Sequence, residues 1–245
     1  MPPSPLDHLE FIDYISFDAG GVLVYLDDVR MAELLTEFCG RPVTPVECMH
    51  TESRALADLG TIDPPNTNGL PHWAHQYFGG MAAQILQRDP QDLPKFNDYD
   101  DFVKRCFDLN VNGMLYSKIG PDAVETLARL KKHGFVLSVT SDASGQVARN
   151  FRTLGLDEYF EFILDSGVMG RSKPELYADL IERAGVPAGR ILHVDNNLRL
   201  VRETSRYGLR GILYDPQDMY GYKSDGVTKF RNLLDMSNML MGRVP

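Results

Sequence analysis

The spacing of hydrophobic and polar positions changes twice along the chain. From Phe11 to Phe17 the residues are mostly apolar, β-branched or aromatic, which is typical of a buried strand, and Asp18 follows with Gly20 and Gly21 close behind. From about residue 26 to residue 117 the apolar residues recur at helical spacing. From Gly120 onward, strand-like and helix-like segments alternate. The pattern therefore predicts an α/β core that is interrupted by a helical block.

The middle block predicts helices and no strand. Its second helix has clear start signals, because Thr44 can cap it, Pro45 fits the first helical position and Glu47 completes a capping box. A loop rich in Pro, Asn and Gly is expected over residues 61–71. The expected helices cover about residues 29–38, 45–59, 71–87 and 99–109.

The alternating part predicts a doubly wound (Rossmann-like) parallel sheet. Strands are expected at residues 135–140, 159–164, 191–195 and 211–214, and helices at residues 123–132, 144–154, 175–184, 198–207 and 227–240. With the first strand this makes five strands, each followed by helical sequence, which favours parallel pairing. We expect residues 1–25 and 118–245 to form this core and residues 26–117 to form an inserted α-helical domain.

Composition and charge limit the function classes. The chain has 245 residues and a net charge of −9, and its 34 acidic residues argue against a nucleic-acid surface, which needs clustered Lys and Arg. A small phosphorylated ligand is compatible with this net charge, because one local basic group is enough to bind a phosphate. Three cysteines without metal-ligand spacing indicate a reducing compartment, and no segment reads as a signal peptide or membrane span. We expect a cytoplasmic protein without a membrane partner; whether it forms a homodimer is left open.

Polar residues recur where the predicted strands end or a helix begins. In a parallel sheet the carboxyl ends of neighbouring strands lie close together, so these residues are expected to converge. Singly, each has an ordinary alternative: a turn, a helix cap or a solvated lysine. As a set they favour one site. They are Asp18, Ser141, Asp142, Lys173, Asp195, Asn196 and Asn197.

The segments that hold these residues resemble the four motifs of the haloacid dehalogenase superfamily, in the family's order. The Asp-x-Gly-Gly-Val-Leu form with an aspartate-containing fourth motif is most similar to sugar-phosphate phosphatases and to the phosphatase half of soluble epoxide hydrolases. The resemblance covers nearly the whole chain and implies that residues 26–117 are the α-helical cap of such enzymes. The matching segments are residues 17–24, 140–142, 172–177 and 193–197.

The resemblance implies a phosphatase that acts on a small phosphorylated metabolite. Asp18 would be the nucleophile that forms an aspartyl-phosphate. Ser141 and Lys173 would complete the catalytic set by binding the phosphoryl oxygens. Asp142 and Gly21 would also line the phosphate site.

The same resemblance implies a Mg²⁺ site, with two departures from the family pattern. Its ligands would be Asp18, the Gly20 carbonyl, Asn196 and Asp195. Gly20 stands where most of these phosphatases have a second aspartate as general acid and base, and Asn196 stands where they usually have a metal-binding aspartate. We therefore expect weak Mg²⁺ binding. Two alternatives stay open: a dehalogenase-like or isoprenoid diphosphate-processing enzyme, and a phosphate-binding protein without turnover.

Four aromatic residues cluster near the third helix of the middle block. The spacing of His72 and His75 could bring both imidazoles to one face, but a second metal site is disfavoured because no carboxylate or cysteine partner is evident. Trp73 and Tyr77 are expected to line the core or a pocket. His193, inside a predicted strand, is expected to be a buried structural residue.

Overall fold

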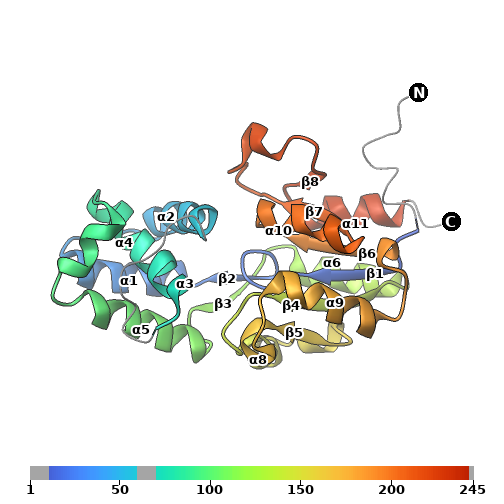
Figure 1. The fold of residues 1–245 in the computed structure, drawn as a ribbon, viewed down its shortest axis with the longest axis horizontal. Helices are drawn as coiled ribbons and strands as arrows, with labels where there is room; N and C mark the ends of the chain where they lie inside the picture. The colour runs from blue at the N-terminus through green and yellow to red at the C-terminus, as the bar shows by residue number, and fades with distance from the viewer. Residues whose placement is uncertain (1–10, 60–69, 243–245) are drawn as a thin grey trace. The chain divides into compact units, whose positions relative to one another are not determined.

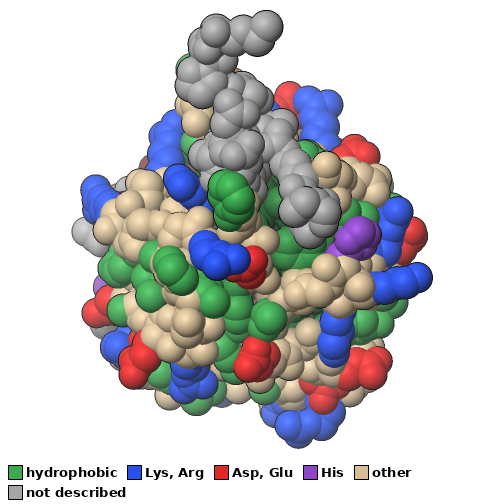
Figure 2. All heavy atoms as spheres, turned by 90° about the vertical axis from the view of Figure 1, so that its right-hand side faces the viewer, with side chains coloured by type: hydrophobic (Ala, Val, Ile, Leu, Met, Phe, Trp, Pro, Cys, Tyr) green, Lys and Arg blue, Asp and Glu red, His purple; other side chains and the backbone are tan. Residues whose placement is uncertain are grey.

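The structure is a computed structural model that describes residues 11–59 and 70–242 (Figure 1). The chain divides into two compact units, one formed by Leu26–Tyr116 and the other by the segments on either side of it. Within the described ranges, no helix is long and apolar enough to cross a membrane. Figure 2 shows basic and acidic side chains interspersed over one face of the molecule.

The flanking unit contains a six-stranded sheet in the order β5-β4-β1-β6-β7-β8 (Figure 1). All of its neighbouring strands are parallel, which confirms the predicted fold class. The two strands at its centre, β1 and β6, are buried along their whole length, as expected for a parallel sheet covered on both faces. The strands are β1 (Tyr14–Phe17), β4 (Val136–Ser141), β5 (Ile163–Asp165), β6 (Ile191–Asp195), β7 (Arg210–Tyr214) and β8 (Lys229–Phe230).

Helices surround this sheet, and several of them end where the sequence predicts. Gly155, Gly185 and Gly208 each adopt the left-handed conformation that ends a helical segment. Helix α6 packs with α11, and α9 packs with α10. The helices are α6 (Ala123–Lys132), α7 (Val147–Leu154), α8 (Ser166–Met169), α9 (Lys173–Ala184), α10 (Leu198–Glu203) and α11 (Leu233–Met241).

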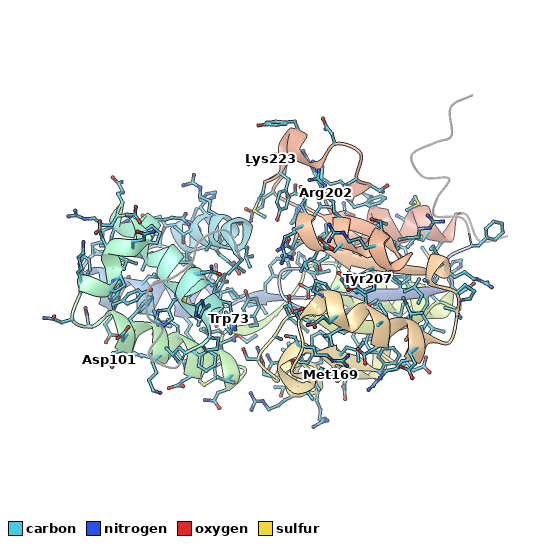
Figure 3. All side chains as sticks on the ribbon, viewed as in Figure 1. Trp73, Asp101, Met169, Arg202, Tyr207 and Lys223 are labelled. Atoms are coloured by element: carbon cyan, nitrogen blue, oxygen red, sulfur yellow. The ribbon has the colours of Figure 1, made fainter. Side chains whose placement is uncertain are left out.

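The unit formed by Leu26–Tyr116 is mainly helical. The capping box at the start of α2 is present: the Thr44 side chain accepts from the Glu47 N–H, and the Glu47 side chain accepts from the Thr44 N–H. Trp73, labelled in Figure 3, packs against Phe78 and Phe107 with ring centroids 6.1 and 5.8 Å apart. The segments are α1 (Asp28–Cys39), α2 (Pro45–Asp58), α3 (His72–Ala74), a π-helical turn (His75–Gly79), α4 (Gly80–Leu86), a 3₁₀ turn (Pro90–Lys95) and α5 (Tyr99–Val111).

The structure corrects the prediction that residues 26–117 contain no strand, because two short strands overlap the ends of this block. Strands β2 (Val24–Leu26) and β3 (Tyr116–Ile119) pair as a separate two-stranded sheet, and the chain passes from one unit to the other within β2 and at the start of β3. β2 has only three residues, and β3 is polar and partly exposed, so neither carries the hydrophobic pattern that marks a strand.

Several further expectations were wrong at element ends, and the first strand begins at Tyr14 instead of Phe11. The predicted helix at residues 227–240 begins only at Leu233, capped by Asn232, and β8 occupies part of the preceding segment. The predicted strand at residues 159–164 is shorter, because Tyr159 ends a 3₁₀ turn and β5 starts at Ile163. The predicted helix at residues 144–154 starts at Val147. Most of the predicted loop at residues 61–71 lies outside the described residues.

Candidate active site

Asp18 stands directly after β1, the strand between β4 and β6. Its backbone N–H donates to the Val194 carbonyl at 2.8 Å, which continues the parallel pairing with β6 by one residue. The chain then turns sharply, with Gly21 at a φ of 75° and its N–H donating to the Val24 carbonyl. Asp18 is buried at these strand ends, with a relative exposure of 8% for the whole residue.

Lys173 connects Asp18 with Asp195, far away in sequence. It is the first residue of α9, and only 1% of its surface is exposed. Its Nζ donates to Asp18 Oδ1 at 2.6 Å and to Asp195 Oδ2 at 2.7 Å. One buried ammonium group is therefore shared by two carboxylates, as expected for a charge that could not otherwise be buried.

This cluster shifts the ionisation of its members in opposite directions. Burial raises the pKa of Asp18 to about 6, the Lys173 charge lowers it and the Asp195 charge raises it further. The pKa of Asp195 lies well below its usual range, because Lys173 and His193 overcome the opposing effect of burial. The pKa of Lys173 is raised, since the two carboxylates outweigh burial. Of the two carboxyl groups, Asp195 therefore ionises at the lower pH.

Ser141 and Asp142 lie at the carboxyl end of the neighbouring strand, β4. Ser141 is the buried last residue of β4, which pairs with β1, and a hydrogen bond from Ser141 lowers the pKa of Asp18. Asp142 accepts the backbone N–H of Lys173 at 2.7 Å through Oδ1, so it holds the start of α9. The structure thus brings Asp18, Ser141 and Lys173 together as expected. Asp142 contacts the backbone of Lys173 and not its ammonium group.

Asp195, Asn196 and Asn197, at the end of β6, each make different contacts. Asp195 Oδ1 accepts the Asn197 N–H at 2.7 Å, and Oδ2 accepts from Lys173 and lies 3.2 Å from His193 Nε2. Asn197 caps α10 by accepting the backbone N–H of the second and third residues that follow it. Asn196 lies against Gly21, so closely that a β-carbon at Gly21 would overlap its Nδ2 atom.

The residues at this end of the sheet include oxygen donors, the ligand type that Mg²⁺ prefers. No cluster of three or more His, Cys, Asp or Glu residues suited to a metal exists within residues 11–59 and 70–242. The contact of Asn196 with Gly21 is made by the amide nitrogen and places this side chain beside the turn that contains Gly20. Asp18, the Gly20 carbonyl and the Asn196 amide supply oxygens of the type that a hard cation prefers, and their joint contact with Mg²⁺ stays a prediction. Asp195 already accepts from three donors, and its direct metal contact stays a prediction.

Two polar residues make side-chain contacts that the sequence did not predict. His193 is fully buried, as expected, but it also contacts Asp195. Glu52 on α2 is half-buried and accepts from the hydroxyl groups of Tyr77 at 2.8 Å and Tyr116 at 3.3 Å. Burial raises the pKa of Glu52 to about 7. No sequence signal marks Glu52, because its partners lie 25 and 64 positions away.

His72 and His75 lie in different environments. His72 is exposed, whereas His75 is buried with its Nδ1 atom 3.3 Å from the Tyr99 hydroxyl. Tyr77 is buried, in keeping with the expected core or pocket position.

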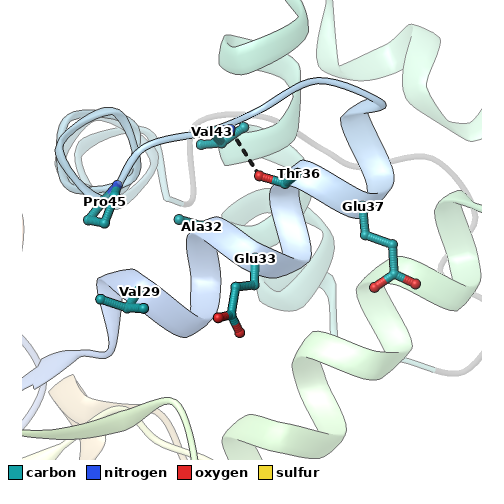
Figure 4. Close-up of a pocket in the computed structure, with 7 residues that line it drawn as sticks. All are labelled: Val29, Ala32, Glu33, Thr36, Glu37, Val43 and Pro45. Carbon is teal, nitrogen blue, oxygen red and sulfur yellow. Dashed lines mark hydrogen bonds between the residues drawn. The ribbon is translucent and has the colours of Figure 1, made fainter.

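A separate groove of about 350 Å³ lies between α1 and the segment leading into α2 (Figure 4). At its edge the Val43 N–H donates to Thr36 Oγ1 at 2.9 Å. None of the predicted site residues lines the groove, which is bounded by Val29, Ala32, Glu33, Thr36, Glu37, Val43 and Pro45.

The parallel sheet and the polar residues at its strand ends define an α/β protein of the haloacid dehalogenase type. A family model described as haloacid dehalogenase-like hydrolase matches residues 12–199. The chain therefore belongs to the haloacid dehalogenase-like hydrolase family.

Individual relatives match over shorter segments. The chain is 37% identical over 76 residues to the 5-amino-6-(5-phospho-D-ribitylamino)uracil phosphatase YigB of Escherichia coli, covering 30% of each protein. It is 28% identical over 100 residues to the phosphoglycolate phosphatase of Aquifex aeolicus, covering 40% of this chain and 46% of that protein. The matches thus span less than half the length of these two relatives.

The fold similarity extends over the whole chain. The structure of the putative HAD-hydrolase YfnB from Bacillus subtilis, described as bound to magnesium, has a TM-score of 0.63 and 17% identity, covering 94% of this chain and 98% of YfnB. At this identity the similarity establishes the fold.

Proposed function

We propose that this protein is a phosphatase that hydrolyses a small phosphorylated metabolite with Asp18 as the nucleophile. The observation that carries the proposal is the 2.6 Å contact between Lys173 Nζ and Asp18 Oδ1, with Ser141 at the end of the adjacent strand. This contact holds a carboxylate beside a permanent positive charge, as a phosphoryl acceptor requires. The family membership and the phosphatase names of two relatives support the same reaction class.

The reaction proceeds in two displacements. The ionised Asp18 carboxylate attacks phosphorus, the bond from phosphorus to the leaving oxygen breaks, and an aspartyl-phosphate forms. Water then attacks the phosphorus of this intermediate and releases inorganic phosphate and free Asp18. Lys173 orients the carboxylate and stabilises negative charge on the phosphoryl oxygens, and the Ser141 hydroxyl donates a hydrogen bond to them.

We assign Mg²⁺ binding to Asp18, the Gly20 carbonyl, Asn196 and Asp195. When bound, the ion would neutralise charge on the phosphoryl group. The magnesium described for YfnB supports the choice of metal. Because Asn196 supplies a neutral oxygen in place of a carboxylate, we expect weak binding.

We also assign the role of cap domain to residues 26–117, which would select the substrate. The support for this role is the position of the helical unit in the sequence, directly after the turn that follows Asp18. A cytoplasmic location stays our expectation from the cysteine pattern.

The test is hydrolysis of a panel of phosphorylated metabolites and p-nitrophenyl phosphate, with and without Mg²⁺, by the wild type and Asp18→Asn. We expect Asp18→Asn to lose at least about 10³-fold in kcat, because the amide cannot act as the nucleophile. Asp101→Asn, at an exposed position labelled in Figure 3, is the matched control and should be unchanged. Turnover of 2-haloacids in place of phosphate esters, or activity that survives Asp18→Asn, would overturn the proposal.

A further inference from the structure

A buried chain of hydrogen bonds approaches Asp195 from the interior of the sheet. His193 and Ser16 are register partners on β6 and β1, and His193 Nδ1 lies 3.3 Å from Ser16 Oγ. The Ser16 hydroxyl is in turn hydrogen-bonded to the Thr140 hydroxyl on β4 at 3.0 Å. His193 Nε2 lies 3.2 Å from Asp195 Oδ2. Three neighbouring strands are thus connected to one carboxylate oxygen.

The chemistry of these groups sets the direction of the bonds. An ionised carboxylate can only accept hydrogen bonds, so the proton of a neutral His193 must lie on Nε2, which donates to Asp195. Nδ1 then faces the Ser16 oxygen at 3.3 Å, while the Ser16 hydroxyl donates to Thr140 Oγ1. The Tyr177 ring packs against His193 in an edge-to-face arrangement, with the two ring centroids 5.2 Å apart, and this contact limits rotation of the imidazole.

Asp195 Oδ2 is also the atom that receives the second bond of Lys173. Oδ1 is held by the Asn197 N–H and Oδ2 by His193, so contacts other than Lys173 hold both oxygens in place. The lysine Nζ therefore meets a carboxylate of fixed orientation at 2.7 Å and stays within 2.6 Å of Asp18. Without His193, Oδ2 could turn away and draw Lys173 from Asp18.

We propose that His193 is a positioning residue whose Nε2–H fixes Asp195, and thereby holds the Lys173 ammonium against the Asp18 carboxylate. The inference rests on the proposed function for its effect on catalysis, whereas the geometry of Lys173 can be tested without turnover.

Three replacements of His193 separate positioning from packing. His193→Gln can present an amide N–H near the place of Nε2, His193→Asn presents one near the place of Nδ1, and His193→Leu fills space without a donor. We expect the Gln variant to keep kcat within about threefold, and the Asn and Leu variants to lose about 10- to 100-fold in kcat with a smaller change in KM. Equal losses in all three variants would show that His193 only fills space and would overturn the proposal.

Ser16→Ala tests the chain without changing His193. It removes the group that faces Nδ1, so we expect a loss of kcat of about two- to fivefold. Ser138→Ala is the matched control: Ser138 is the register partner of Ser16 on β4, equally buried, and among the described residues its hydroxyl makes no hydrogen bond to this chain of groups. Equal effects of the two substitutions would contradict the proposal.

The Lys173 ammonium gives a readout that does not depend on activity. In protein with ¹⁵N-labelled lysine, a buried hydrogen-bonded ammonium gives a slowly exchanging Nζ signal, which is assigned by its absence in Lys173→Met. We expect this signal in the wild type and in His193→Gln, and its shift or loss through fast exchange in His193→Asn. An unchanged signal in His193→Asn would overturn the inference. If the wild type has no phosphatase activity but the signal behaves as expected, the proposed function fails and the positioning of Lys173 stands.

Discussion

Asn196 packs against Gly21 so closely that no side chain fits at position 21 without displacing it. Gly21 belongs to the turn after β1, and Asn196 to the turn after β6. This contact fixes the amide of Asn196 beside the turn that carries Asp18, and it explains why glycine is needed there both for its φ of 75° and for space.

Gly21→Ala should therefore affect activity as well as stability. Gly40→Ala is the matched control, because Gly40 has a similar φ of 65° with nothing within 4 Å of an added β-carbon. We expect both variants to lose about 1–2 kcal/mol of unfolding free energy from the left-handed conformation, with a further loss for Gly21→Ala. Only Gly21→Ala should lose phosphatase activity, by about tenfold or more. The measurements are thermal unfolding and phosphatase kinetics of both variants. Equal phosphatase activities would contradict the role of the contact between Gly21 and Asn196.

Asn196→Asp should tighten Mg²⁺ binding. The substitution replaces a neutral oxygen by a carboxylate, so we expect a Kd lower by roughly tenfold, or about 1.4 kcal/mol, in calorimetric titrations. Asn197→Asp is the control, because it adds the same charge one residue away while aspartate still caps α10. Tight binding by the wild type with no gain in Asn196→Asp would show that another group already supplies the charge.

The rate should depend steeply on the leaving group. Gly20, two residues after Asp18, has no side chain that could protonate the departing oxygen, and general acids usually contribute about 10²- to 10⁴-fold. We expect kcat/KM for a series of aryl phosphates to rise strongly as the pKa of the leaving phenol falls. Gly20→Asp should flatten this dependence, and Gly20→Asn, which has no acidic proton, should not. A flat dependence in the wild type would indicate a general acid elsewhere.

Glu52 should make the stability of the protein depend on pH. Its pKa is raised from its usual 4.5 to about 7, so the folded chain holds this proton more tightly than the unfolded chain. The resulting contribution to stability is full below pH 4.5 and is lost as the pH rises through about 7.

Glu52→Gln keeps an acceptor for Tyr77 and cannot ionise. Compared with the wild type, we expect it to be more stable by about 1–2 kcal/mol at about pH 8 and similar at about pH 5, in urea unfolding. Glu33→Gln, at an exposed position on α1, should show no such difference. A Glu52→Gln variant that is less stable than the wild type at about pH 8 would contradict the assigned shift.

The sheet could be predicted because the hydrophobic pattern of its main strands matches their burial in the structure. Continuous apolar runs mark β1, β4 and β6, and glycines mark the helix ends at residues 155, 185 and 208. The missed strands β2, β3 and β8 have three, four and two residues. They are too short to show a period, and their pairing depends on distant chain segments.

The candidate site was predictable to the level of which residues meet, but not of how they bond. Parallel topology alone places Asp18 near Lys173, which is 155 residues later. The contact of His193 with Ser16 depends on the register of β6 against β1, which no local pattern sets. The burial of Glu52 likewise depends on Tyr77 and Tyr116, which come from other elements.

The most direct test of the account is acid quenching during turnover of a phosphorylated substrate, followed by mass spectrometry of the peptide that contains Asp18. If Asp18 is the nucleophile, this peptide from the wild type carries one phosphoryl group on Asp18 within the first turnover, and the peptide from Asp18→Asn carries none. Turnover at a measurable rate without this adduct at any quench time, or the adduct on another residue, would contradict the assignment of Asp18 as the nucleophile.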